Sequence, residues 1–193
     1  MKVLELLTLE NLRHLSGKTG GSPLHNTSVK RFRLQNIPTS APDTPTAFVD
    51  AKVESDFGFD KNVELPTVAP SVANKPYQYA YGIHVHRENE KDSTEPVANS
   101  IIKIDVKTGD TKVWKDEDHV PGEPIFVPTP GGTEEDEGVL LTVVLNGKKG
   151  TSALVVLHAQ TMEEVGRAEM SIPFPFGFHV STISFSFSFC DRD

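Results

Sequence analysis

The sequence predicts an all-β fold, and three features of the chain carry that prediction. Short runs rich in β-branched and aromatic residues recur at roughly ten-residue intervals across positions 100–170. Fourteen glycines and fourteen prolines separate these runs. Helical periodicity is weak along the whole chain. Such a pattern is typical of a sandwich, a barrel or a propeller assembled from consecutive hairpins.

The expected strands follow one another with short turns between them. Seven runs read as strands, at positions 48–53, 77–81, 100–105, 111–114, 139–145, 153–157 and 167–170. Residues 122–127 are expected to pair with 139–145. Tight hairpin turns are predicted at 108–110 and at 146–150, which both contain glycine. Residues 139–145 are apolar on both faces, so this strand should be covered on both sides, as in stacked propeller blades.

Other segments give weaker or different signals. Residues 4–15 fit one amphipathic helix or, equally, a strand followed by a turn, and 161–165 could form a single helical turn. Two long loops are expected at 38–45, which is rich in proline, and at 88–96, which is charged. The basic residues of 30–33 alternate with an aromatic residue and are expected to form a solvated strand face.

Composition excludes several classes of function. The chain has 193 residues, of which 37% are hydrophobic, enough for one domain with a core. Its net charge of −8 and the lack of a basic stripe argue against nucleic-acid binding. No apolar run approaches the ~20 residues of a membrane span, and the acidic N-terminal segment does not read as a signal peptide. With Cys190 as the single cysteine, a reducing, cytoplasmic location is expected.

Two of the seven histidines stand close together on one predicted strand. His84 and His86 are two residues apart, so both side chains should point to the same face. An imidazole pair can begin a metal site, although no acidic or cysteine partner follows at a fixed spacing. The alternative is an exposed pair that leads into the charged loop. His14, His25, His119 and His158 are expected to be ordinary surface histidines.

Three further residues lie where apolar neighbours surround a titratable group. His179 ends the string Pro173-Phe-Pro-Phe-Gly-Phe-His179, and it could be either a hydrogen-bonded core histidine or a metal ligand. Glu64 and Glu123 each lie beside apolar residues and a proline. Each could face solvent at a strand entry. Alternatively, each could accept a hydrogen bond from a metal-bound histidine, through the ring nitrogen that does not bind the metal.

Several segments together resemble one known family, the carotenoid cleavage oxygenases. The resemblance rests on Glu123-Pro-Ile-Phe-Val-Pro128, the Pro130-Gly turn, the acidic run 134–137 and Gly138-Val-Leu-Leu141. Further matches are Glu163-Glu-Val-Gly-Arg-Ala-Glu169, Pro175-Phe-Gly-Phe-His179, Glu64-Leu-Pro66 and Lys75-Pro-Tyr-Gln-Tyr-Ala-Tyr-Gly82. Similarity is strong over 63–179 and weaker over 1–34. The matched segments are those of the C-terminal portion of the family.

The resemblance implies a fold, a cofactor and a reaction. The family fold is a seven-bladed β-propeller whose axis holds a non-haem Fe(II) ion, bound by four histidines that glutamates support. The reaction is the cleavage of a carotenoid or apocarotenoid double bond with O2 to two carbonyl products. By position, His179 is similar to the last iron ligand, and Glu64 and Glu123 are similar to two of the supporting glutamates. No catalytic residue beyond these is assigned.

The chain also departs from the family. The segments that carry the other three ligand histidines have no counterpart in this sequence. A blade takes ~40–50 residues, so the chain is expected to form three to four blades of an open ring. Residues 1–179 are interpreted as the C-terminal part of the propeller. Residues 180–193, with their Ser/Phe alternation, form a divergent tail.

Three functions remain open at this point. The first is a piece of a carotenoid dioxygenase, inactive alone, with peripheral membrane contact only in the full-length protein. The second is a non-catalytic β-domain that binds an apolar isoprenoid. The third is an unrelated metal-binding or scaffold β-protein that uses His84 and His86.

Overall fold

A computed structural model describes residues 28–35, 37, 50–58, 61–86 and 99–174. Within these ranges the regular structure is antiparallel β-sheet, apart from the short 3-10 turn η3 (Pro70–Val72) and a single 3-10 residue, Lys61. The prediction of an all-β fold is confirmed. No helix in these ranges is long and apolar enough to cross a membrane. The segments predicted at 4–15, 38–45, 88–96 and 180–193 lie outside the described residues.

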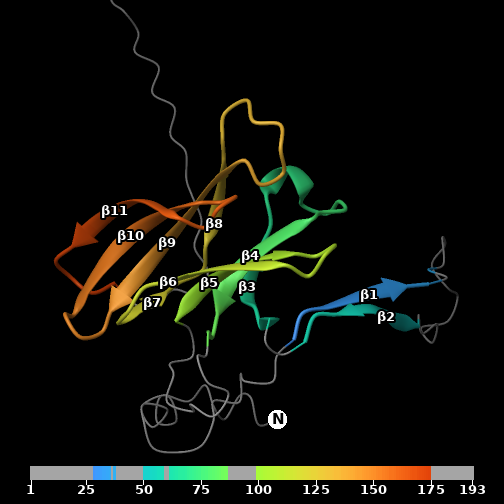
Figure 1. The fold of residues 1–193 in the computed structure, drawn as a ribbon, viewed down its shortest axis with the longest axis horizontal. Helices are drawn as coiled ribbons and strands as arrows, with labels where there is room; N and C mark the ends of the chain where they lie inside the picture. The colour runs from blue at the N-terminus through green and yellow to red at the C-terminus, as the bar shows by residue number, and fades with distance from the viewer. Residues whose placement is uncertain (1–27, 36, 38–49, 59–60, 87–98, 175–193) are drawn as a thin grey trace, which may run out of the picture.

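The strands form three sheets (Figure 1). The first is a hairpin of β1 (Lys30–Leu34) and β2 (Ala51–Asp56). The second has the order β3 (Glu64–Thr67), β4 (Tyr79–His84), β5 (Ser100–Asp105), β6 (Thr111–Lys115). The third comprises β7 (His119–Pro121), β8 (Ile125–Pro128), β9 (Gly138–Asn146), β10 (Thr151–His158) and β11 (Glu164–Met170), with both β7 and β8 paired to β9.

The turns form where the sequence places residues that accept a positive φ. Gly109, at φ +81°, closes the hairpin between β5 and β6, and Gly150, at φ +64°, closes the one between β9 and β10. Both predicted turns are therefore confirmed. The predicted helical turn at 161–165 is wrong, because Met162 takes a φ of +65° and Glu164 already belongs to β11. This segment is the turn of a hairpin.

A hydrophobic core joins the second and third sheets. Tyr81, Ile101 and Trp114 enter it from the second sheet, and Leu140 and Val155 from the third, each at most 8% exposed. Burying such side chains contributes ~1.5–3 kcal/mol apiece, so this interface is the main source of stability. Along β9 fully buried and half-buried residues alternate, so one of its faces is less completely covered than predicted.

The opposite face of β5 packs toward the β1–β2 hairpin. Ile102, Ile104 and Val106 form a second, smaller core with Val29 and Phe57, which lie at the base of the hairpin. Five of the six residues of β5 are buried, since β5 has neighbours on both faces. The described structure is thus layered: the hairpin base, the β3–β6 sheet and the β7–β11 sheet (Figure 1).

The two larger sheets are also tied by a buried ion pair. The ammonium of Lys103 on β5 lies 2.5 Å from a carboxylate oxygen of Asp136, and the two side chains are 6% and 13% exposed. The same ammonium lies 4.1 Å from the ring centroid of Tyr79. Nearby, Glu135 accepts hydrogen bonds from the backbone N–H groups of Gln78 and Tyr79. The acidic run 134–137 therefore has a structural role.

Candidate functional site

Glu64 lies at the start of β3, beside a distortion of the strand. It pairs with Ile83 of β4, and the register shifts before the next pair, Thr67 with Tyr81. Leu65 takes a φ of +49°, an uncommon conformation for a branched side chain. Irregularities of this kind are frequent beside functional sites, where they redirect a side chain. Glu64, which is half-buried, therefore lies next to a strained stretch of backbone.

A close approach of β3 and β4 holds this distortion in place. A Cβ added to Gly82 would lie 2.7 Å from the backbone oxygen of Glu64 and would also collide with the side chain of Val63. Only glycine permits this approach, because any side chain at position 82 would push the two strands apart.

Glu123 lies in a bulge opposite β9. Pro121 of β7 pairs with Val144, and Ile125 of β8 pairs with Leu141. Three residues, 122–124, therefore face two residues, 142 and 143, of β9. Gly122 is fixed on both sides, because its N–H donates to Val143 O and its carbonyl accepts from Thr142 Oγ1, each at 2.9 Å.

The bulge is rigid on both sides of Glu123. Pro121 and Pro124 are both fully buried, whereas Glu123 itself is half-buried. Glu123 also makes an interaction with another group. A carboxylate held in this way between buried prolines can present an acceptor in a fixed direction, which is what support of a ligand histidine requires.

His179 lies outside the described residues. Its predicted role as a metal ligand, and its position relative to Glu64 and Glu123, therefore stay predictions. Within the ranges that the structure describes, no group of three or more His, Cys, Asp or Glu side chains could hold a metal ion. The described residues do not by themselves fit an iron ion.

His84 and His86 form a pair, but the pair is not exposed as expected. Their ring centroids lie 6.1 Å apart, and His84 is only 4% exposed. His84 Nδ1 lies 2.7 Å from the backbone oxygen of Asn62. The N–H of His86 donates to the side chain of Asn99, whose amide donates back to His86 O, both at 2.7 Å. These contacts make the pair part of the framework at the end of β4.

One cluster of charged groups was not predicted. Arg167 on β11 donates to Glu164 and, at 2.6 Å, to Asp116, whose carboxylate also lies 3.1 Å from His119 Nδ1. The hydrogen bonds from Arg167 hold the pKa of Glu164 below its usual range despite partial burial. The His119 side chain is 13% exposed. It is therefore not the ordinary surface histidine that was expected.

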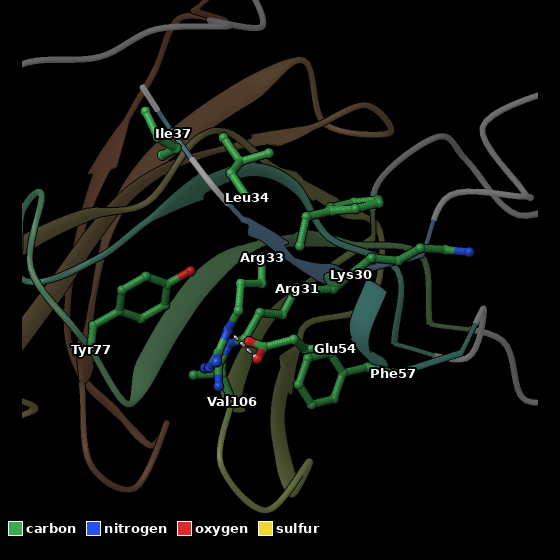
Figure 2. Close-up of a pocket in the computed structure, with 11 residues that line it drawn as sticks. Lys30, Arg31, Arg33, Leu34, Ile37, Glu54, Phe57, Tyr77 and Val106 are labelled. Carbon is green, nitrogen blue, oxygen red and sulfur yellow. Dashed lines mark ion pairs between the residues drawn. The ribbon is translucent and has the colours of Figure 1, made fainter. Parts of the chain in front are cut away.

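A groove of about 570 Å³ lies between β1 and the second sheet (Figure 2). Figure 2 shows Arg31 and Arg33 extending from β1 into it, with Tyr77 to one side of them and Phe57 to the other. Arg33 forms an ion pair with Glu54 at 2.6 Å. One wall of this groove is thus charged, which does not favour a wholly apolar isoprenoid as its occupant.

Comparison with known proteins defines the class. The family model described as retinal pigment epithelial membrane protein matches residues 3–181, which is most of the chain. The chain belongs to this family, which is that of the carotenoid cleavage oxygenases. The resemblance seen in the sequence is thereby confirmed.

Individual relatives agree with this assignment. The chain is 41% identical over 117 residues to a carotenoid dioxygenase of Neurospora crassa, a match that covers 60% of this chain and 18% of the relative. It is 30% identical over 205 aligned positions to the human mitochondrial carotenoid-cleaving dioxygenase, covering 92% of this chain and 34% of that protein. The chain therefore spans about a fifth to a third of the curated relatives it matches.

Solved structures of the same class share the fold. A variant of the Synechocystis apocarotenoid oxygenase superposes with a TM-score of 0.58 and 29% identity, covering 68% of this chain and 26% of that one. A cobalt-substituted form of the same oxygenase gives a TM-score of 0.58 at 27% identity, with the same coverage. The sheets described above thus correspond to part of that enzyme.

Proposed function

We propose that this chain supplies the C-terminal portion of a non-haem Fe(II) dioxygenase that cleaves a carotenoid or apocarotenoid. In the proposed reaction one C=C bond of the polyene breaks and each carbon receives one oxygen atom of O2, which gives two carbonyl products. The observation that carries the proposal is the family match over residues 3–181, together with relatives named for carotenoid cleavage.

In this proposal the chain forms three to four blades of a seven-bladed propeller, of which the described residues make up two larger ones and part of a third. The four-stranded β3–β6 sheet and the five-stranded β7–β11 sheet pack face to face through one core, as neighbouring blades do. His179 would bind the iron, and Glu64 and Glu123 would orient ligand histidines by accepting their ring N–H. The remaining ligands would come from the rest of the family fold, so the chain alone would be inactive.

A chimera tests this proposal. The chain would replace the matching C-terminal portion of the Neurospora crassa dioxygenase, and iron content and cleavage of a carotenoid would be measured. We expect one iron per chimera and O2-dependent formation of carbonyl products. His179→Ala should abolish iron binding, whereas His86→Ala, outside the proposed site, should leave the iron content unchanged.

The supporting glutamates make a finer test. Glu64→Gln and Glu123→Gln should each lower iron affinity or activity by about 10–100-fold, because loss of a hydrogen bond behind a ligand has this effect in other metal sites. A chimera that binds iron equally well with alanine at position 179 would refute the assigned ligand. Full activity in both glutamine variants would refute the role of the carboxylates.

A further inference from the structure

The turn between β9 and β10 begins with a chemically reactive pair of residues. Asn146 ends β9, and it is the single asparagine of the sequence that a glycine follows. Asparagine is a thermolabile residue. In an Asn–Gly pair the glycine nitrogen can attack the asparagine side chain, because the glycine carries no Cβ that obstructs the approach. A Cβ added to Gly147 would meet nothing within 4 Å, so the turn also leaves open space here.

The reaction of such a pair is deamidation. A bond forms between the Gly147 nitrogen and Cγ of Asn146, while Nδ2 leaves as ammonia with the proton that the Gly147 nitrogen loses. Water then opens the resulting succinimide ring, which gives aspartate or isoaspartate at position 146. Isoaspartate lengthens the main chain by one carbon atom. Because Asn146 pairs with both His119 of β7 and Thr151 of β10, this product would disturb the end of the third sheet.

The folded chain holds both polar atoms of the Asn146 side chain. Oδ1 accepts hydrogen bonds from the backbone N–H groups of Lys148, at 3.1 Å, and Lys149, at 2.9 Å. Nδ2 lies 3.2 Å from Nε2 of His119. Since two N–H donors identify the oxygen, the NH2 group must face the imidazole, and Nε2 is the acceptor. Asn146 is only 4% exposed.

His119 is in turn fixed as an acceptor. With Nε2 accepting, the proton of the neutral imidazole is on Nδ1, which lies 2.8 Å from the backbone oxygen of Glu117 and 3.1 Å from the Asp116 carboxylate. Asp116 also accepts from Arg167 at 2.6 Å. A line of contacts therefore runs from β11 through the imidazole to the reactive amide. We call Asp116, His119 and Asn146 the latch.

We propose that Asn146 is a deamidation site of this chain and that the latch controls its rate. The inference does not depend on the proposed function. Closing the succinimide ring requires Cβ and the Gly147 nitrogen to lie on the same side of the Asn146 Cα–C bond, whereas the extended backbone of a strand residue keeps them apart. Rotation about this bond moves Asn146 away from His119 and from the turn amides. The reaction therefore proceeds from a locally open form, at the rate of the unfolded chain multiplied by the open fraction.

The test follows deamidation at each asparagine by mass spectrometry of peptides, at constant pH and temperature. It uses the full 193-residue chain. In urea we expect Asn146 to react before any other asparagine, and Gly147→Ala to slow it, because the new side chain obstructs the attack. In the folded chain, the rate at Asn146 should be lower by about tenfold or more, because only the open fraction reacts.

Two substitutions of His119 isolate the latch. His119→Phe keeps a planar ring but removes the acceptor, so Asn146 of the folded chain should react about two- to tenfold faster, the factor that one hydrogen bond contributes to local opening. His119→Gln can accept through its amide oxygen and should restore most of the protection. The matched control is Val120→Ala, at the next position of β7. It trims a side chain packed against the core and should react like the parent.

Hydrogen exchange on the parent chain gives a second readout that needs no variant. The Lys149 amide donates to Asn146 Oδ1, so its exchange reports the opening of the latch. The product of this opening constant and the rate in urea should equal the rate in the folded chain. A folded rate above that product would overturn the proposal, because the reaction would then occur with the latch closed.

Three results of the deamidation measurements would also overturn the proposal. The first is an equal rate at Asn146 in the folded chain and in urea. The second is a faster reaction of another asparagine in urea. The third is an equal rate for His119→Phe and Val120→Ala in the folded state, since the imidazole would then not protect the amide.

Discussion

The buried ion pair between Lys103 and Asp136 gives the sharpest prediction on stability. Replacing Asp136 by Asn removes the charge and preserves the shape. The ammonium of Lys103 would keep a 3.5 Å contact to Gln160 O and the face of the Tyr79 ring, but no anion. Its side chain is only 6% exposed. Breaking a buried pair from one side costs about 3–5 kcal/mol.

We expect Asp136→Asn to lower the free energy of unfolding by about 3 kcal/mol. This is the lower end of the range of about 3–5 kcal/mol, because the amide oxygen can still accept a hydrogen bond. For a chain of this size the loss corresponds to a decrease of roughly 6–12 °C in Tm. The measurement is urea and thermal unfolding followed by circular dichroism. The control is Asp118→Asn, which breaks the exposed ion pair with Lys148. Asn also accepts the positive φ at position 118, so the control should leave the midpoint unchanged.

The pair should also make stability depend on pH. Burial alone would raise the pKa of Asp136, but the hydrogen bonds from Lys103 and Gln160 and the Lys103 charge outweigh it and lower that pKa. A carboxyl whose pKa is lowered by folding stabilises the protein above its unfolded pKa of about 4. This contribution is lost as the pH falls through the folded pKa. The parent and Asp136→Asn should therefore converge in stability in acid.

A double variant completes the test of this pair. Lys103→Met combined with Asp136→Asn should cost less than the sum of the two single changes, because the second change removes the charge that the first leaves unpaired. Additive losses in the free energy of unfolding would refute the view that the pair couples the two sheets. A loss for Asp136→Asn that is no larger than the loss for the exposed control would refute it as well.

Two further substitutions probe the packing of the third sheet. Gly138→Ala should lower the free energy of unfolding by about 1–3 kcal/mol, because the new Cβ would collide with the backbone oxygen of Val127 and lie 2.8 Å from the ring of Phe126. Gly166→Ala, with open space around it, should not destabilise the protein. Equal unfolding midpoints for the two variants would contradict this. Leu157→Ala should lower the free energy of unfolding by about 2–5 kcal/mol, because the side chain is fully buried. Val165→Ala, at an exposed site, should lower it far less. Denaturant titration of the two variants measures the difference.

The strands and turns could be predicted because their causes are local. A run of β-branched residues between turn residues predicts a strand at 100–105, and the observed strand has the same bounds. Glycine at positions 109 and 150 supplies the positive φ that two of the hairpins require. Met162 could not be predicted in the same way, since nothing in its neighbourhood indicates a left-handed residue. There the tertiary structure overrides the local preference.

The polar contacts depend on distant partners and were not predictable. Lys103 and Asp136 are 33 positions apart, and only the packing of two sheets brings them together. For the same reason His84 was expected at the surface and is buried against Asn62. Glu64 and Glu123 are both half-buried, and their support of ligand histidines stays a prediction. The strained Leu65 and the bulge opposite β9 emerged only from the structure.

The account is tested most directly by the iron content of the chain in two states. Iron would be quantified by mass spectrometry after reconstitution with Fe(II) under anaerobic conditions, first on the isolated chain and then on the chimera with the Neurospora crassa enzyme. We predict no tightly held iron on the isolated chain, one iron per chimera, and none in the chimera with His179→Ala. One tightly bound iron per isolated chain, or iron retained without the imidazole at position 179, would contradict the account.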